Sequence, residues 1–153
     1  MSFHIDFKDA AIGVQSKSIN MSNGSFVREL CDSRTFCRSV DVETMRANGL
    51  ARGGSLENAV VVDGESVLNP SGMRYSDEPV RHKMLDALGD LALAGAPIIG
   101  HYTGFRAGHE ITNNLLRELF SEPGAVEQIQ CTPDMLACLP GVGVTEQEIP
   151  KSA

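Results

Sequence analysis

Apolar and polar residues alternate at the start of the chain. Residues 3–7, Phe-His-Ile-Asp-Phe, have this period of two, which predicts a first strand. A second extended or mixed region is expected over residues 18–30. The spacing becomes helical in residues 40–49, where Val42 and Met45 are three positions apart and Gly49 is a typical helix end.

The middle of the chain holds the clearest turn signal and the longest helical pattern. Residues 59–69 are apolar on both sides of an Asp-Gly pair, which predicts a β-hairpin. After Ser76, a typical capping residue, come two acidic residues and Pro79, and apolar residues then recur at helical spacing. We therefore expect a helix from Ser76 to near Gly95.

The last third of the chain has shorter patterns. Residues 96–104 are expected to form a short strand or loop, and residues 109–120 a second helix ended by Pro123 and Gly124. Residues 125–131 could supply a last strand. Residues 132–153 are expected to be a loosely ordered tail.

Two consecutive helices between hairpin-rich segments predict an α+β fold, a two-layer sandwich in which two helices pack on a mainly antiparallel sheet. A doubly wound parallel fold would need regular strand–helix alternation, which the pattern lacks. With 153 residues, 42% of them hydrophobic, the chain can bury one domain-sized core.

The charge argues against two classes of partner. A formal net charge of −7 disfavours nucleic acid or an anionic membrane as the main partner, because both bind through clustered Lys and Arg. The start lacks a basic segment followed by an apolar run, and the longest apolar stretch, residues 91–100, is too short for a transmembrane segment. We expect a soluble, cytoplasmic protein whose four cysteines are reduced thiols, since their spacing fits neither a zinc knuckle nor a redox motif.

Three polar side chains interrupt the apolar pattern of the predicted helix. His82, Asp86 and Asp90 are four residues apart, and positions four apart on a helix are rotated by only about 40°. His82 and Asp86 can both reach one zinc ion, as two histidines do in HExxH helices. The alternative is a solvated polar face with a chance His–Asp contact, which is common on helices.

Other candidate residues carry weaker signals. His109 begins the second helix, where the helix dipole disfavours a protonated imidazole and an anion could bind, or it is only a capping or surface histidine. Thr35 offers a hydroxyl donor, although most such threonines are structural. The Gly-Gly-Ser of residues 53–55 permits close backbone approach, but this pattern usually makes only a turn.

Four segments in order closely resemble the second half of UDP-3-O-acyl-N-acetylglucosamine deacetylase, the LpxC family. They are SRTF at residues 33–36, GLARGGSLENAVVVD at 49–63, VLNPSGMRYSDEPVRHKMLDALGDL at 67–91 and GHEITNNLLRELF at 108–120. The resemblance runs from about Phe3 to Phe120, and residues 81–91 are highly specific to the family. With it, metal binding at His82 and Asp86 becomes the favoured interpretation.

The resemblance implies a zinc hydrolase of lipid A synthesis in Gram-negative bacteria, built from two similar domains with the active site between them. His82 and Asp86 would be the zinc ligands in the second domain. Asp90 would orient His109, the general acid or electrostatic partner of the leaving amine. Thr35 would donate a hydrogen bond to the oxyanion.

The same resemblance implies where the substrate binds. Asp6, Phe7 and Lys83 match positions near the nucleotide, with Phe7 stacking on uracil and Lys83 contacting a phosphate or sugar. Residues 36–62 match an inserted strand–helix–strand unit that forms a hydrophobic passage for the fatty acyl chain. The residues expected to line this passage are Phe36, Val42, Leu50, Ala51 and Ser55. The domain would then span residues 1–131 and the tail residues 132–153.

A catalytic zinc normally has three protein ligands and a water, and this chain offers two. In the family the third ligand, a histidine, and the general-base glutamate come from a first domain that no segment here resembles. His4 and His101 match no motif of the family. We therefore expect half an active site, inactive alone, that needs a first-domain polypeptide to act on a UDP-3-O-acyl-glucosamine-type substrate. The alternatives are an inactive remnant that binds a UDP-sugar or a partner protein without catalysis, and a purely structural domain.

The chain departs from the family pattern in two places. Cys37 and Arg38 stand where the family continues with Gly-Phe, so Arg38 must point to solvent or the acyl passage is altered, because burying an unpaired guanidinium costs several kcal/mol. Pro79 replaces an aromatic residue just before the ligand helix, where a proline is tolerated in the first turn.

Overall fold

The alternating N-terminal segment forms the central strand of a three-stranded sheet. In the computed structural model, which describes residues 1–137, 139 and 144–148, β1 (Ser2–Asp6) pairs antiparallel with β2 (Val14–Ser18) and parallel with β6 (Thr103–Phe105). Alternation places Phe3 and Ile5 in the core, while the ring of His4 stacks on Phe105 on the other face.

A second three-stranded sheet carries the strand–helix–strand segment. Strand β3 (Thr35–Arg38) pairs parallel with β4 (Ala59–Asp63), and β4 pairs antiparallel with β5 (Ser66–Val67) through the Asp-Gly turn. Helix α2 (Ser39–Ala47) makes the crossover that a parallel pair requires. Gly64 in the turn has φ +57°, a conformation that glycine adopts without strain.

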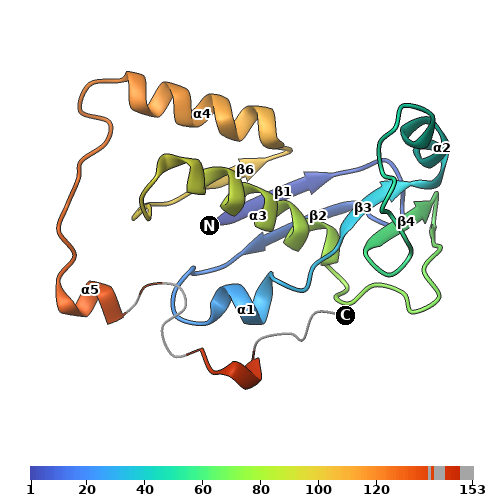
Figure 1. Ribbon diagram of the computed structural model, residues 1–153, viewed down its shortest axis with the longest axis horizontal. Coiled ribbons are helices and arrows are strands. Elements are labelled where there is room, and N and C mark those ends of the chain that lie inside the picture. The colour runs from blue at the N-terminus through green and yellow to red at the C-terminus, as the bar shows by residue number, and fades with distance from the viewer. Residues whose placement is uncertain (138, 140–143, 149–153) are drawn as a thin grey trace.

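Two long helices form the second layer. Helix α3 (Glu78–Leu91) continues as the 3₁₀ helix η1 (Ala92–Ala94) and ends at Gly95, which has the left-handed φ of +78°. It contacts β1, β2 and β3, and α4 (His109–Ser121) packs beside it (Figure 1). The short helix α1 (Ser25–Glu29) follows β2.

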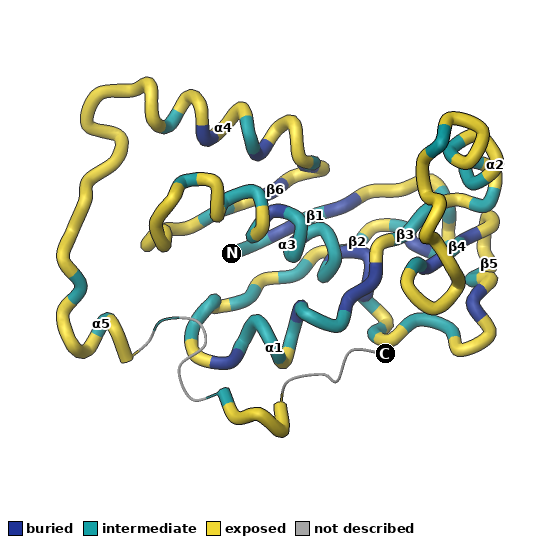
Figure 2. Tube along the Cα trace, in the orientation of Figure 1, coloured by how far each residue is buried: buried dark blue, intermediate teal, exposed yellow. Residues whose placement is uncertain are grey.

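The core lies between α3 and the two sheets. Buried residues concentrate in the centre of Figure 2, whereas α2 has no buried residue and most of α4 is exposed. Val80, Met84 and Ala87 provide the buried face of α3 at helical spacing. The other buried apolar residues of this cluster are Phe3, Ile5, Ile12, Leu30, Val60, Val62 and Ala107.

The α+β fold and its helix layer are confirmed, with differences in detail. Each sheet joins one antiparallel and one parallel pair, so the sheet is not mainly antiparallel. The parallel pairs arise because helices lie between β3 and β4 and between β1 and β6 along the chain. The extended region expected over residues 18–30 is instead β2, which starts earlier, followed by α1. Asp77, rather than Ser76, is the N-cap of α3.

The strand expected over residues 125–131 does not form. Val126 and Ile129 are about half exposed, and no described strand pairs with this segment. An alternating pattern alone cannot make a strand without a partner edge. Within the expected tail, the structure describes α5 (Pro133–Ala137) and the 3₁₀ helix η2 (Glu146–Glu148); residues 138, 140–143 and 149–153 lie outside the described residues. The boundary near residue 131 stays a prediction.

Two expectations from composition can be compared with the structure. Of the helices in the described part, none has both the length and the apolar character needed to cross a membrane. Cys31, Cys37 and Cys131 are free thiols, as expected; Cys138 lies outside the described residues.

Two glycine substitutions should have opposite effects on stability. A Cβ at Gly104 in β6 would overlap the ring of Phe3, so G104A should lower the free energy of unfolding by about 1–3 kcal/mol. The matched variant G89A lies on the exposed side of α3, has no heavy atom within 4 Å of the new Cβ, and should stabilise by roughly 0.5–1 kcal/mol. Urea denaturation of both variants tests this, and equal changes would contradict the packing of β6 against β1.

Candidate metal and catalytic site

Helix α3 brings the predicted polar stripe together on one face. The Nε2 atom of His82 lies 3.3 Å from Oδ1 of Asp86, and both side chains are largely buried, with 16% and 18% exposed. A nitrogen and an oxygen donor are therefore adjacent and reachable from one side. The two side chains face one another as expected from their spacing of four.

The ring of His82 is oriented by contacts from β3 and the residues before it. Its Nδ1 lies 3.2 Å from the carbonyl oxygen of Ser33, and since a carbonyl only accepts, Nδ1 donates this hydrogen bond. Nε2 is then the nitrogen that faces Asp86. Phe36 packs edge-on against the imidazole, with ring centroids 6.3 Å apart. A hydrogen bond like the one from Nδ1 to Ser33, made by the ring nitrogen that does not bind the metal, is the usual way in which a metal-ligating histidine is held.

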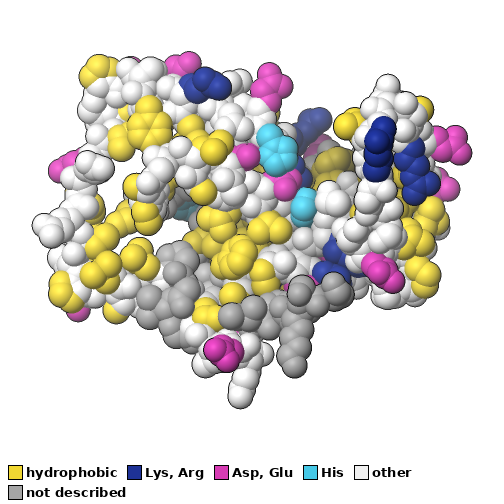
Figure 3. All heavy atoms as spheres, viewed as in Figure 1, with side chains coloured by type: hydrophobic (Ala, Val, Ile, Leu, Met, Phe, Trp, Pro, Cys, Tyr) yellow, Lys and Arg dark blue, Asp and Glu magenta, His cyan; other side chains and the backbone are white. Residues whose placement is uncertain are grey.

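His109 lies beside this pair at the first turn of α4. Its Nδ1 is 3.0 Å from both carboxylate oxygens of Asp90, and its Nε2 is 4.0 Å from Oδ2 of Asp86. The imidazole is 67% exposed, whereas Asp90 is only 13% exposed. The exposed nitrogen of His109 is thus available to a bound molecule, while the other is held by a carboxylate. Figure 3 shows histidine and acidic side chains gathered on this face.

The carboxylate of Asp86 also accepts from a lysine. Nζ of Lys83 lies 2.8 Å from Oδ2 of Asp86. Lys83 in turn lines a hollow of about 230 Å³ together with Asp6, Phe7 and Arg106. A positive charge therefore lies between the His82–Asp86 pair and this hollow.

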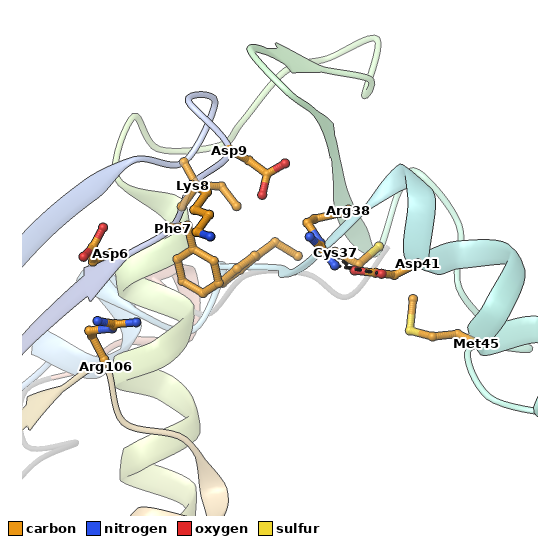
Figure 4. A pocket seen from close by; sticks show the side chains of 11 residues that line it. Asp6, Phe7, Lys8, Asp9, Cys37, Arg38, Asp41, Met45 and Arg106 are labelled. Carbon is orange, nitrogen blue, oxygen red and sulfur yellow. Dashed lines mark hydrogen bonds and ion pairs between the residues drawn. The ribbon is translucent and has the colours of Figure 1, made fainter.

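A larger hollow of about 510 Å³ lies next to it, between the loop after β1 and the strand–helix segment β3–α2 (Figure 4). Phe7 and Phe36 both line it, and their rings meet edge to face at 5.2 Å. Asp6 and Arg106 stand at one end in Figure 4, and Met45 of α2 at the other.

The expected passage residues are only partly gathered around this hollow. Phe36 lines it, and α2 contributes Asp41 and Met45 rather than Val42. Leu50, Ala51 and Ser55 lie exposed in the segment between α2 and β4 and do not line it. The exposed Thr35 begins β3, immediately after the buried Arg34.

Arg38 is half exposed and paired rather than buried without a partner, and it also lines the larger hollow. Its guanidinium makes two hydrogen bonds to the carboxylate of Asp41, at 2.7 and 2.9 Å, and both side chains are about half exposed. These hydrogen bonds raise the pKa of Arg38. The wall of the larger hollow is therefore charged where Arg38 and Asp41 line it.

Arg106 is a cavity residue that the sequence reasoning missed. It lines both hollows. Its backbone has a left-handed φ of 51°, in the turn before α4. Its backbone N–H donates to the carbonyl oxygen of His4. The available signal was a basic residue shortly before a helix N-terminus, a place suited to an anion.

The donor set fits zinc in kind but not in number. Imidazole nitrogen and carboxylate oxygen are normal zinc ligands, and Ser33 holds His82 in the tautomer that leaves Nε2 available. In the part of the chain that the structure describes, however, no group of three or more His, Cys, Asp or Glu side chains could hold a metal ion. His82 and Asp86 are thus two adjacent donors, one fewer than the three protein ligands that a catalytic zinc usually has.

The fold and the site together define an α+β domain that carries adjacent histidine and carboxylate side chains on its helix layer. The sequence model of the UDP-3-O-acyl N-acetylglycosamine deacetylase family, LpxC, matches residues 1–121, and the chain belongs to this family. This confirms the resemblance inferred from the sequence segments.

Curated relatives match over much of this chain but over less than half of their own length. A UDP-3-O-acyl-N-acetylglucosamine deacetylase of Phenylobacterium zucineum is 51% identical over 125 residues, 82% of this chain and 43% of the relative. That of Myxococcus xanthus is 48% identical over 127 residues, 83% of this chain and 40% of the relative. That of Bdellovibrio bacteriovorus is 43% identical over 131 residues, 86% of this chain and 43% of the relative.

Proposed function

We propose that this chain is the second-domain half of a zinc-dependent deacetylase that hydrolyses the N-acetyl group of UDP-3-O-acyl-N-acetylglucosamine in lipid A biosynthesis, in the cytoplasm. The observation that carries the proposal is the pairing of His82 with Asp86 next to the pairing of His109 with Asp90. Membership of the family and the names of the relatives support the substrate class.

His82 and Asp86 would hold the zinc ion. When bound, zinc lowers the pKa of a water to about 7 and so supplies hydroxide at neutral pH. The carbonyl of Ser33 fixes the imidazole of His82, so that Nε2 keeps its lone pair for the metal. Lys83, which contacts Asp86 in the chain alone, would turn toward substrate in the complete site.

The remaining side chains serve the amide. The hydroxyl of Thr35 donates to the negative charge that develops on the carbonyl oxygen of the amide. His109 gives a proton from Nε2 to the leaving amine, and Asp90 stabilises the imidazolium through Nδ1. The amine then leaves as a neutral group.

Substrate binding is assigned to the surfaces beside these residues. Phe7 offers an aromatic face for the base, with Asp6 and Lys83 nearby for sugar or phosphate. Phe36, Val42, Leu50, Ala51 and Ser55 would receive the acyl chain; the high exposure of Leu50 suits a surface that an alkyl chain covers.

The missing ligand and the general base would come from a first-domain polypeptide. His4 and His101, the two other histidines, are engaged elsewhere: His4 contacts Ser16 and Phe105, and His101 contacts Ser2. This supports a site completed by a second polypeptide segment rather than within this chain.

Mixing the chain with a separately produced first domain tests the proposal. We expect no deacetylation and weak Zn²⁺ binding by the chain alone, and Zn²⁺-dependent turnover after mixing. The H82A variant should abolish that turnover, whereas H101A, a histidine outside the site, should leave it unchanged. Turnover by the chain alone, or turnover insensitive to H82A, would overturn the proposal.

A second candidate function is UDP-sugar binding without catalysis. It is favoured by the hollow in which Phe7, Lys83 and Arg106 place an aromatic ring and two cations together independently of any metal. Titration calorimetry with UDP distinguishes the two: binding that is unaffected by H82A, in a mixture that never turns over, would favour this candidate.

A further inference from the structure

The polar stripe of α3 begins one turn earlier than the sequence suggested. Glu78 lies four residues before His82, and it is fully buried at the first turn of the helix. Its carboxylate accepts four hydrogen bonds. The donors are the backbone N–H, Nε and Nη2 of Arg34, at 2.9, 2.9 and 3.1 Å, and the backbone N–H of Arg74, at 2.6 Å.

Arg34 neutralises this buried carboxylate. Its side chain is only 5% exposed, and Nη2 also donates to the carbonyl oxygen of Gly72 at 2.8 Å. Burial raises the pKa of the Glu78 carboxyl, but the hydrogen bonds from Arg34 and Arg74 outweigh it and hold the pKa below its usual value. Buried ion pairs are a poor means of stabilisation compared with apolar packing, so a geometric role is the better explanation for this one.

One peptide group connects Glu78 to the metal-ligand histidine. The N–H of Arg34 and the carbonyl of Ser33 belong to the same peptide plane, and they point in opposite directions. Glu78 accepts from the N–H at 2.9 Å, and the carbonyl accepts from Nδ1 of His82 at 3.2 Å. Glu78 and His82 are one helical turn apart, about 6 Å along the axis, so one peptide group can lie between their side chains.

We propose that Glu78 is a positioning residue for His82, acting through the Ser33–Arg34 peptide group. The negative carboxylate fixes the plane of the peptide and polarises it, so that the Ser33 carbonyl becomes a better acceptor for Nδ1–H. His82 is thereby held with Nε2 toward Asp86. The same anchor sets the start of β3 and hence the position of Thr35. This inference rests on the proposed function only in calling His82 a metal ligand.

The first test measures the ring N–H of His82 by NMR in the chain without metal. In the wild type, Nδ1–H should appear as a slowly exchanging resonance, because the Ser33 carbonyl holds it. E78D keeps the charge but withdraws the carboxylate by one methylene, and should speed the exchange at least tenfold. R34K is the matched control: it weakens the same ion pair but keeps the backbone N–H that Glu78 binds, so the exchange should stay slow.

The second test measures Zn²⁺ affinity in the mixture with the first domain. E78D should weaken Zn²⁺ binding roughly tenfold to a hundredfold, the range found for groups that orient metal ligands, and R34K should weaken it less. Equal ring exchange in E78D and wild type, or equal acceleration in E78D and R34K, would overturn the inference. If E78D does not fold, fast exchange of the His82 ring N–H in the wild type is by itself enough to overturn the inference. Absence of Zn²⁺ binding by the wild-type mixture would instead count against the proposed function, and leaves the ring measurement valid.

Discussion

E78Q should lower the free energy of unfolding by about 3–5 kcal/mol, the usual cost of breaking a buried ion pair by removing one charge. The guanidinium of Arg34 would remain buried with only neutral partners, and the amide nitrogen of the glutamine would face donors rather than accept from them. Urea denaturation followed by circular dichroism measures the change.

The exposed pair of Arg38 and Asp41 provides the control. Its two hydrogen bonds are as short as those at Glu78, but both side chains are about half exposed to solvent. D41N should therefore leave the stability nearly unchanged. A similar loss in D41N and E78Q would show that burial does not determine the strength of the Glu78 pair.

The same carboxyl predicts a dependence on pH. The pKa of Glu78 is lower in the folded chain than in the unfolded one, so its stabilisation is present above the unfolded pKa and is lost as the pH falls through the folded pKa. Asp77 has a lowered pKa as well, because the hydrogen bonds from Arg81 and Lys17 outweigh the effect of its burial. The wild type should lose stability in this acidic range, and E78Q should lose less. Parallel curves of the free energy of unfolding against pH for the wild type and E78Q would exclude Glu78 as a source of the acid sensitivity.

H109A should lower kcat about 10²- to 10⁴-fold in the mixture with the first domain, because general acid catalysis to the amine contributes about that much. KM should change far less, since the imidazole acts on a proton that moves in the transition state. Steady-state kinetics with a UDP-3-O-acyl-N-acetylglucosamine substrate measures both constants.

Asp90 gives a graded comparison for this prediction. D90N removes the charge behind Nδ1 of His109 but keeps an acceptor oxygen, so the loss in kcat should be smaller than in H109A. H101A again serves as the control for loss of a histidine elsewhere. A larger effect of D90N than of H109A would contradict the assignment of His109 as the proton donor and of Asp90 as its supporting carboxylate.

The sequence determined the elements that depend on local pattern. The helix containing His82, the hairpin around Asp63–Gly64 and the second helix all follow from apolar spacing and turn residues, and all are present. The proximity of His82 to Asp86 follows from helix geometry, because residues four positions apart lie on the same face of a helix.

The sequence did not determine what depends on distant partners. Residues 125–131 have a strand pattern but no neighbouring edge, and the parallel pairing of β1 with β6 joins segments about a hundred residues apart. Arg106 lines the hollow only because the turn before α4 brings it back against β1.

The candidate site divides in the same way. The chain by itself specified the helix, its polar stripe and the family segments, since these are local properties of residue type and spacing. The family resemblance implied that Asp90 orients His109, and the structure shows this contact, but only the tertiary structure placed the Ser33 carbonyl on His82 and Glu78 behind that peptide. Those contacts join residues between 19 and 49 positions apart, and their geometry is set by the packing of α3 against β3 and α4, which no local pattern encodes.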